Sequence, residues 1–256
     1  MPPGGQPGGY PMSPGSSPNI GDGVKWAINK FGQNAGVMLA FAAIVMVVNL
    51  LGRGASGLAN SSADNVTNDL NDCANLTGDA YIDCITGTTT TSTGLLLGMG
   101  LLSLIISVVF WVLQVLAQIG LINASLKITR GERPAFSDLW TPQHFWQFIF
   151  VGILYGLAVG FGLLLCLIPG LLAIWAWQFA QYSALNSGPG IGASFGESWR
   201  MVSANKGPAI VTLLVLFVAS IITVVTCGIG ALVVAPFSTL FMANMFRQFR
   251  QEPIAA

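Results

Sequence analysis

Charged residues are scarce in this 256-residue chain: they make up 8% of it, against 53% hydrophobic residues. Soluble domains usually carry about 25% charged residues, so water alone could not solvate this surface. Ten basic and ten acidic side chains cancel, which leaves no electrostatic footprint for nucleic acid. The composition therefore predicts an all-α, polytopic membrane protein whose main partner is the lipid bilayer, with no nucleic-acid partner.

Residue types that usually carry catalysis or bind metals are also few. His144 is the single histidine, and no Cys-x-x-Cys or histidine-rich spacing indicates a metal site. The string Gly192-Ala-Ser-Phe-Gly196 matches a nucleophile elbow, but that motif needs a strand–turn–helix with histidine and acid partners. Ser194 followed by Glu197 is better explained as a helix capping box. The glycine-rich string 188–193 matches a dinucleotide fingerprint but follows no predicted strand. We therefore expect no enzyme, no catalytic residues, no cofactor and no metal.

Long uncharged stretches indicate six transmembrane helices. A spanning helix needs roughly 20 mainly apolar residues. Two stretches fit one span each, and the two longer ones fit two spans each, with breaks at the Ile168-Pro169-Gly170 corner and near Gly228–Gly230, because proline and glycine interrupt helices. The prediction is three helical hairpins. The uncharged stretches are 36–51, 94–126, 139–196 and 207–246.

The basic residues are segregated in this arrangement. Arg53 alone falls on the outer side, so the positive-inside rule places both termini in the cytoplasm and the protein in the cell (inner) membrane, with multiple passes. The long polar start before residue 36 is unlike a signal peptide, which agrees with an inside N-terminus. The inner basic residues are Lys25, Lys30, Lys127, Arg130, Arg133, Arg200, Lys206, Arg247 and Arg250.

Three polar regions flank or interrupt the predicted membrane domain, 19–250. Residues 1–18 are rich in proline and glycine and carry no charge, which predicts a disordered cytoplasmic tail; a solvated tail is preferred over a partner-binding one. Residues 53–93 are predicted to form an acidic extracytoplasmic loop, for which simple solvation is preferred over ion binding. Residues 251–256 are expected to be a short cytoplasmic tail.

A tryptophan-containing amphipathic stretch precedes each predicted hairpin. In the first, Ile20, Val24 and Ile28 fall on one side of a helix while Lys25 faces away. The pattern predicts three interfacial helices on the cytoplasmic surface, each anchored by an indole at headgroup level. The anchoring residues are Trp26, Trp140 and Trp199.

Two further groups of residues are candidate sites inside the spans. Amide side chains either hydrogen-bond helices together, contributing roughly 0.6–2 kcal/mol each, or line a polar cavity for a lipid headgroup; the first is preferred because such bonds are routine. Glycines at four-residue spacing predict close helix packing, within the chain or between copies. The amides are Gln114, Gln118, Asn123, Gln178, Gln181 and Asn244, and the glycines are Gly152, Gly156 and Gly160.

The four cysteines divide into two pairs by location. Cys73 and Cys84 lie in the predicted outer loop, where an oxidising environment favours a disulfide. Cys166 and Cys227 fall at the outer ends of two spans. They form either a second bridge or two small buried apolar residues, and the second reading is preferred.

Several short strings resemble a known group of membrane proteins. They are the Pro/Gly-rich start, Gly21-Asp-Gly-Val-Lys-Trp26, 124–134, Leu164-Leu-Cys-Leu-Ile-Pro-Gly170, and Ser198-Trp199 followed by Asn205-Lys-Gly207. They resemble actinobacterial proline- and glycine-rich integral membrane proteins and, more distantly, the membrane domain fused to some glycerophosphodiester phosphodiesterases. The long acidic loop departs from that pattern, and these residues contain no counterpart of the phosphodiesterase domain. The resemblance implies a fold and a location but no activity.

Two functional classes remain open at this stage. The first is a non-enzymatic protein that organises the envelope membrane or interacts with lipid, through a membrane-protein partner or a specific lipid. The second is a small-molecule or lipid transporter. No charged residue is predicted deep inside a span, which counts against ion-coupled transport. We therefore expect the first.

Overall fold

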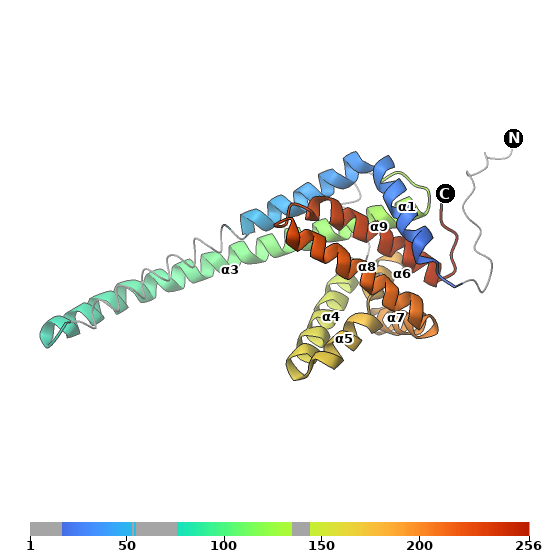
Figure 1. Cartoon of the computed structure of the whole chain (residues 1–256). Coiled ribbons are helices and arrows are strands. Elements are labelled where there is room, and N and C mark those ends of the chain that lie inside the picture. The colour runs from blue at the N-terminus through green and yellow to red at the C-terminus, as the bar shows by residue number, and fades with distance from the viewer. Residues whose placement is uncertain (1–16, 53, 55–75, 135–143, 256) are drawn as a thin grey trace. The chain divides into compact units, whose positions relative to one another are not determined.

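The computed structural model describes residues 17–52, 54, 76–134 and 144–255, with the backbone alone for 85–103. Helices dominate these residues, and no β-strand occurs among them (Figure 1). The all-α prediction is confirmed for this part of the chain. The helices are α1 (Ile20–Gln33), Ala35–Gly52, α3 (Asp79–Thr129), α4 (Phe145–Leu165), α5 (Leu167–Ala176), α6 (Ala180–Ser187), α7 (Ile191–Ala204), α8 (Lys206–Val225) and α9 (Ala231–Phe249).

Four of these helices are long and apolar enough to cross a membrane: Ala35–Gly52, Leu104–Thr129 within α3, α4 and α8. In their most apolar windows only 17% to 33% of the residues are buried inside the protein. A helix that is apolar on nearly all sides yet faces outward suits lipid rather than water. The four helices thus indicate a membrane protein.

The other two predicted spans are not continuous long apolar helices. α5 contains 10 residues, and a turn separates it from the eight-residue α6. α9 contains 19 residues, but its second half carries Asn244, Arg247 and Gln248. The described residues therefore hold four candidate spans, and the six-span arrangement in three hairpins stays a prediction.

The predicted break near Gly228–Gly230 is confirmed. α8 ends at Val225 and α9 begins at Ala231. Between them Cys227 and Gly228 adopt left-handed backbone, with φ of 51° and 88°. A residue with positive φ cannot continue a right-handed helix, so the chain reverses here.

The other predicted break, at the Ile168-Pro169-Gly170 corner, begins slightly earlier in the chain. The helix is interrupted at Cys166, whose extended backbone (φ −171°, ψ 147°) separates α4 from α5. Pro169 and Gly170 lie instead in the first turns of α5. Proline is tolerated there because the first N–H groups of a helix have no intrahelical acceptor.

The predicted outer loop 53–93 includes the beginning of a helix. α3 starts at Asp79, whose negative charge suits a helix N-terminus, and continues to Thr129 over 51 residues. The Thr-rich run 87–93 predicted loop because threonine has a low intrinsic helix propensity, but that preference is weak and is readily overridden. Residues 1–16 of the predicted tail and 55–75 of the predicted loop lie outside the described residues.

Two of the three predicted amphipathic helices are present, as α1 and α7. The segment around Trp140 lies outside the described residues. The described parts of 1–44 and 116–256 form one compact unit, and those of 45–115 form another.

The core of the first unit is the C-terminal half of α9. Every residue from Leu240 to Phe249 is buried, and the rings of Phe246 and Phe249 lie 6.2 and 4.9 Å from that of Phe179. A helix end that is buried on all sides has no water for its polar side chains, so these groups need partners within the protein.

Candidate functional site

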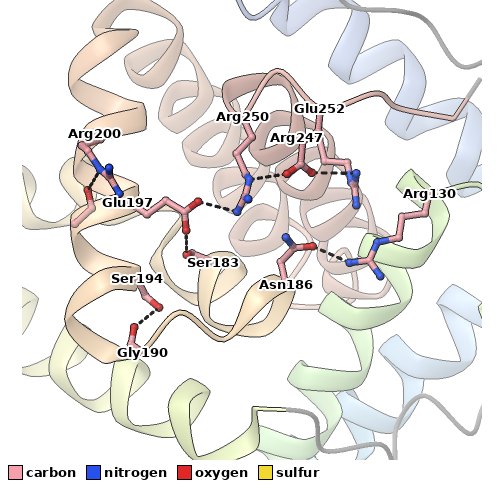
Figure 2. A network of polar contacts seen from close by, with 11 residues as sticks. Arg130, Ser183, Asn186, Gly190, Ser194, Glu197, Arg200, Arg247, Arg250 and Glu252 are labelled. Carbon is pink, nitrogen blue, oxygen red and sulfur yellow. Dashed lines mark hydrogen bonds and ion pairs between the residues drawn. The ribbon is translucent and has the colours of Figure 1, made fainter.

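Charged side chains gather at the C-terminal end of α9 (Figure 2). Arg250 Nη1 lies 2.7 Å from Glu197 Oε1, and Arg250 Nε lies 2.7 Å from Glu252 Oε1. Arg247 Nη1 lies 3.0 Å from the other oxygen of Glu252. These four residues, called here the ion-pair network, join α7, α9 and the end of the chain.

Neighbouring groups complete the bonding of the ion-pair network. Arg247 Nε donates to Thr129 Oγ1 at 2.8 Å, at the end of α3, and Ser183 Oγ donates to Glu197 Oε2. Burial lowers the pKa of the Arg247 guanidinium, and the nearby Glu252 carboxylate opposes that effect. Arg247 is only 8% exposed. A charge this buried is tolerated because its hydrogen bonds and its counter-charge are supplied within the protein.

The last residues of the chain dock against α1 and α3. Trp26 Nε1 donates to the carbonyl of Ala255 at 2.8 Å, and the Ala255 N–H donates to the carbonyl of Thr129 at 2.9 Å. Ile254 is buried. Residues 251–255, expected to be a tail, are therefore held by both backbone and side-chain bonds. Trp26, expected to anchor in the headgroups, has its indole N–H satisfied by the protein itself.

α1 packs closely on α9 through a glycine. A Cβ on Gly23 would lie 3.2 Å from Asn244 Oδ1 and closer still to Met245 Cε, so the Met245 side chain would have to move to admit a larger residue. Beside this contact, Gln248 Nε2 donates to Asn244 Oδ1 at 2.7 Å, and Gln248 Oε1 accepts from the Asn19 N–H at 2.7 Å. Asn244 thus lies in a buried polar group that joins two helices, not in an open cavity.

The remaining amides have separate surroundings. In the unit 45–115, Gln114 Oε1 accepts from Asn49 Nδ2 at 2.9 Å, which joins α3 to Ala35–Gly52. In the other unit, Gln178 Nε2 donates to the Ala209 carbonyl of α8 at 3.4 Å, while its Oε1 is buried with no partner in the described part of the chain. Gln118 is exposed and Asn123 is partly buried.

The predicted glycine ridge of α4 makes contact at one end only. A Cβ on Gly152 would lie 3.3 Å from Gln181 Nε2, but none on Gly156 or Gly160 would meet a described atom within 4 Å. Close packing at Gly156 and Gly160, within the chain or between copies, stays a prediction. Close packing occurs at Gly162, where a Cβ would lie 2.7 Å from the backbone nitrogen of Gly170, because α5 folds back along the end of α4.

The prediction of a capping box at Ser194 and Glu197 is wrong. α7 begins at Ile191, and Ser194 lies one turn inside it, donating from Oγ to the Gly190 carbonyl at 2.9 Å. The capping prediction assumed a helix start at Ser194. Glu197 does not cap the helix and belongs to the ion-pair network.

Ser198 is a structural residue that the sequence reasoning missed. Its Oγ donates to the Ala176 carbonyl at 3.0 Å and accepts from the Phe179 N–H at 3.2 Å. It therefore satisfies the backbone groups left open where α5 stops and α6 has not yet begun. A small hydroxyl residue among other small residues gives no local signal of this role.

The cysteines differ in state. Cys84 is disulfide-bonded, and Cys73, predicted to be its partner, lies outside the described residues. Cys166 and Cys227 are free and exposed, so neither a bridge between them nor their predicted burial is found. In the described ranges no three His, Cys, Asp or Glu side chains are arranged to hold a metal ion.

Trp199 lies on the open face of α7. It is 50% exposed, and its ring meets the edge of Trp175 in α5 at a centroid distance of 6.1 Å. Phe195, one turn earlier in α7, packs inward against the Trp177 ring at 5.2 Å, and Val202 is fully buried. The helix is therefore held by one face while Trp199 remains outward.

Comparison with known proteins finds relatives but no assigned activity. No family model and no solved structure matches the chain. It is 25% identical over 245 residues to the uncharacterized protein Rv2560 of Mycobacterium tuberculosis, covering 94% of this chain and 72% of that protein. The uncharacterized protein Mb2590 of Mycobacterium bovis shows the same identity and coverage. The chain is thus similar, over nearly all of its length, to mycobacterial proteins whose names state no function.

Proposed function

We propose that this chain is a non-enzymatic, multi-pass protein of the cell (inner) membrane that organises lipid or a partner membrane protein. One observation carries the proposal: apolar side chains of four long helices face outward, while the paired charges collect at helix ends in the ion-pair network. Outward apolar helices suit contact with lipid or with another membrane protein. Paired charges at helix ends suit a scaffold, because they fix the helices without exposing charge to lipid.

The proposed topology has six crossings and both termini in the cytoplasm. α5 and α6 together, and the apolar part of α9 (231–243), supply the two crossings beyond the four long helices. The proposal draws on the basic residues, which then lie almost entirely on the inner side. We also propose that the chain shares its fold and location with the proline- and glycine-rich actinobacterial membrane proteins that it resembles.

The two free cysteines provide a direct test of this topology. Both lie at turns that the proposal places on the outer side, Cys166 between α4 and α5 and Cys227 between α8 and α9. A membrane-impermeant maleimide is expected to label them in intact cells, with Cys166→Ala and Cys227→Ala variants identifying each site. Labelling of either cysteine only after permeabilisation would refute the proposed orientation.

Extraction into native-lipid nanodiscs tests the function. Mass spectrometry of everything that accompanies the protein is expected to find a stoichiometric membrane-protein partner or an enriched lipid class, relative to an unrelated multi-pass protein of similar size. Deleting residues 1–18 is expected to weaken binding of a protein partner while leaving insertion into the membrane intact. Bulk lipid alone, at the composition found with the control protein, would overturn the organising role.

A transporter of small molecules or lipids is the second candidate, and one observation favours it. Gln178 Oε1 is a buried acceptor without a described partner, next to the interruption between α5 and α6. Interrupted helices with free polar groups line the substrate sites of many transporters. The same extraction separates the two functions, because a single enriched small molecule, without a protein partner or an enriched lipid class, favours the transporter.

A further inference from the structure

Three helices meet at a corner formed by the end of α5, the end of α7 and the start of α8. α7 ends at Ala204 and α8 begins at Lys206, and Gln178 Nε2 reaches across to the Ala209 carbonyl of α8. Trp175 and Trp199 make their edge-to-face contact at this corner. The corner therefore brings two indoles to the first turn of an apolar helix long enough to span a membrane.

Trp175 has an unused hydrogen-bond donor. Its Nε1 is buried and meets no acceptor in the part of the chain that the structure describes. Buried indole N–H groups usually find an acceptor, and tryptophan is enriched where one end of the side chain is apolar and the other is wet. An oxygen acceptor on a bound molecule would satisfy this N–H.

Two exposed cations on α7 and at the start of α8 have no acidic partner among the described residues. Arg200 Nε makes only a 3.4 Å contact with the Gly196 carbonyl of its own helix (Figure 2). Lys206 is exposed and forms no ion pair with the described residues. Glu197, the acid nearest in sequence, is taken by Arg250 and Ser183. Within the described part of the chain, the corner therefore carries two positive charges that form no ion pair.

The orientation of these groups is set by packing. The opposite face of α7 is buried through Ser194, Ser198 and Val202, so α7 cannot roll to hide Trp199 and Arg200. A fixed surface that combines indoles with unpaired cations matches a molecule that is apolar at one end and anionic at the other.

We propose that Trp175, Trp199, Arg200 and Lys206, the indole–cation corner, bind the headgroup of an anionic phospholipid. The phosphate takes the charges of Arg200 and Lys206, a glycerol or ester oxygen accepts from Trp175 Nε1, and Trp199 lies at headgroup level. A lipid is favoured over free phosphate because only a lipid supplies apolar contact for the indoles and the start of α8. This inference rests on the proposed membrane function and names its lipid class.

The test reconstitutes the full chain into nanodiscs containing equal amounts of phosphatidylglycerol and phosphatidylcholine. After partial delipidation, mass spectrometry measures the ratio of the two lipids retained. We expect phosphatidylglycerol to be enriched and the enrichment to fall roughly fivefold for each cation removed in Arg200→Gln and Lys206→Gln, the effect of one basic residue near an anionic surface. Lys25→Gln with Arg133→Gln removes two other exposed cations and serves as the matched control.

The outcomes separate the corner from general surface charge. Equal losses in the control pair, or no enrichment in the unaltered protein, would overturn the proposal. Trp175→Phe keeps an aromatic ring and removes the N–H. It is expected to reduce retention of both lipids at this site, and to change their ratio less than Arg200→Gln or Lys206→Gln does. Competition by millimolar inorganic phosphate that abolishes the enrichment would show free phosphate as the ligand and overturn the lipid assignment.

The proposed function fails separately. Loss of all partner and lipid enrichment in native discs, with phosphatidylglycerol preference intact in reconstituted discs, would refute the organising role and leave the corner standing. Charge-preserving Arg200→Lys and Lys206→Arg variants keep the test decisive if either glutamine variant fails to fold, because both are expected to retain the preference.

Discussion

Replacing Gly162 with alanine tests the close contact between α4 and α5. The added Cβ would lie 2.7 Å from the backbone nitrogen of Gly170 and 2.8 Å from its Cα. Carbon atoms in favourable contact are about 3.5–4.0 Å apart, so one helix must move by nearly 1 Å. Backbone atoms cannot rotate out of the way as a side-chain tip can. Gly160→Ala is the matched control, since it lies in the same helix and its Cβ would meet no described atom within 4 Å.

The expected magnitude follows from two opposing effects. Alanine gains about 1 kcal/mol over glycine inside a helix, and this gain is common to both variants. Overpacking a tight contact costs about 1–3 kcal/mol, and this cost falls on Gly162→Ala alone. The free energy of unfolding is therefore expected to differ between the two variants by about 1–3 kcal/mol, with Gly160→Ala the more stable.

Thermal unfolding in a single detergent measures this difference. Helical circular dichroism at one fixed scan rate gives an apparent Tm for each variant, which is comparable even if unfolding is irreversible. For a chain of this size 1 kcal/mol shifts Tm by about 2–4 °C. Equal Tm values, or a higher Tm for Gly162→Ala, would show that the α4–α5 contact is not as close as described.

Two further variants test the polar contacts of the first unit. Glu252→Gln removes the charge that pairs with both Arg247 and Arg250 and is expected to lower the free energy of unfolding by about 2 kcal/mol. Glu132→Gln removes an exposed carboxylate that acts on Arg247 without forming an ion pair with it, and is expected to lower Tm less. Equal shifts would contradict a specific role for the ion pairs. Ser198→Ala leaves a buried N–H and a buried carbonyl between α5 and α6 without partners and is expected to cost about 1–3 kcal/mol. A wild-type Tm for this variant would contradict that assignment.

The sequence predicted those features that depend on short stretches of chain. The helices α1 and α7 follow from apolar residues at helical spacing, and the reversal near Gly228 follows from glycine's tolerance of positive φ. The break between α4 and α5 was predicted around Pro169 and lies at Cys166. Pro169 indicates a helix boundary, but it fits equally well in the first turn of the helix that follows.

The candidate site depends on pairs of residues far apart in the chain. Glu197 was expected to cap its own helix and instead pairs with Arg250, and Trp26 was expected to meet lipid and instead donates to Ala255. Local spacing cannot rank these partners, because each choice depends on which helix ends come together. The same holds for Gly162, whose role appears only once α5 folds back on α4.

Composition and hydropathy by themselves determined that this chain is helical and suited to a membrane, because the free energy of burying apolar surface in lipid sums over residues whatever their partners. Only the tertiary structure decided how the polar minority is satisfied. α9 ends inside the protein, so its arginines and amides had to find acceptors at the start of α1, on α3 and α7, and on the docked C-terminal residues. The free-energy cost of burying a polar group depends on whether a hydrogen-bond partner lies within about 3 Å of it. The fold determines whether such a partner is present.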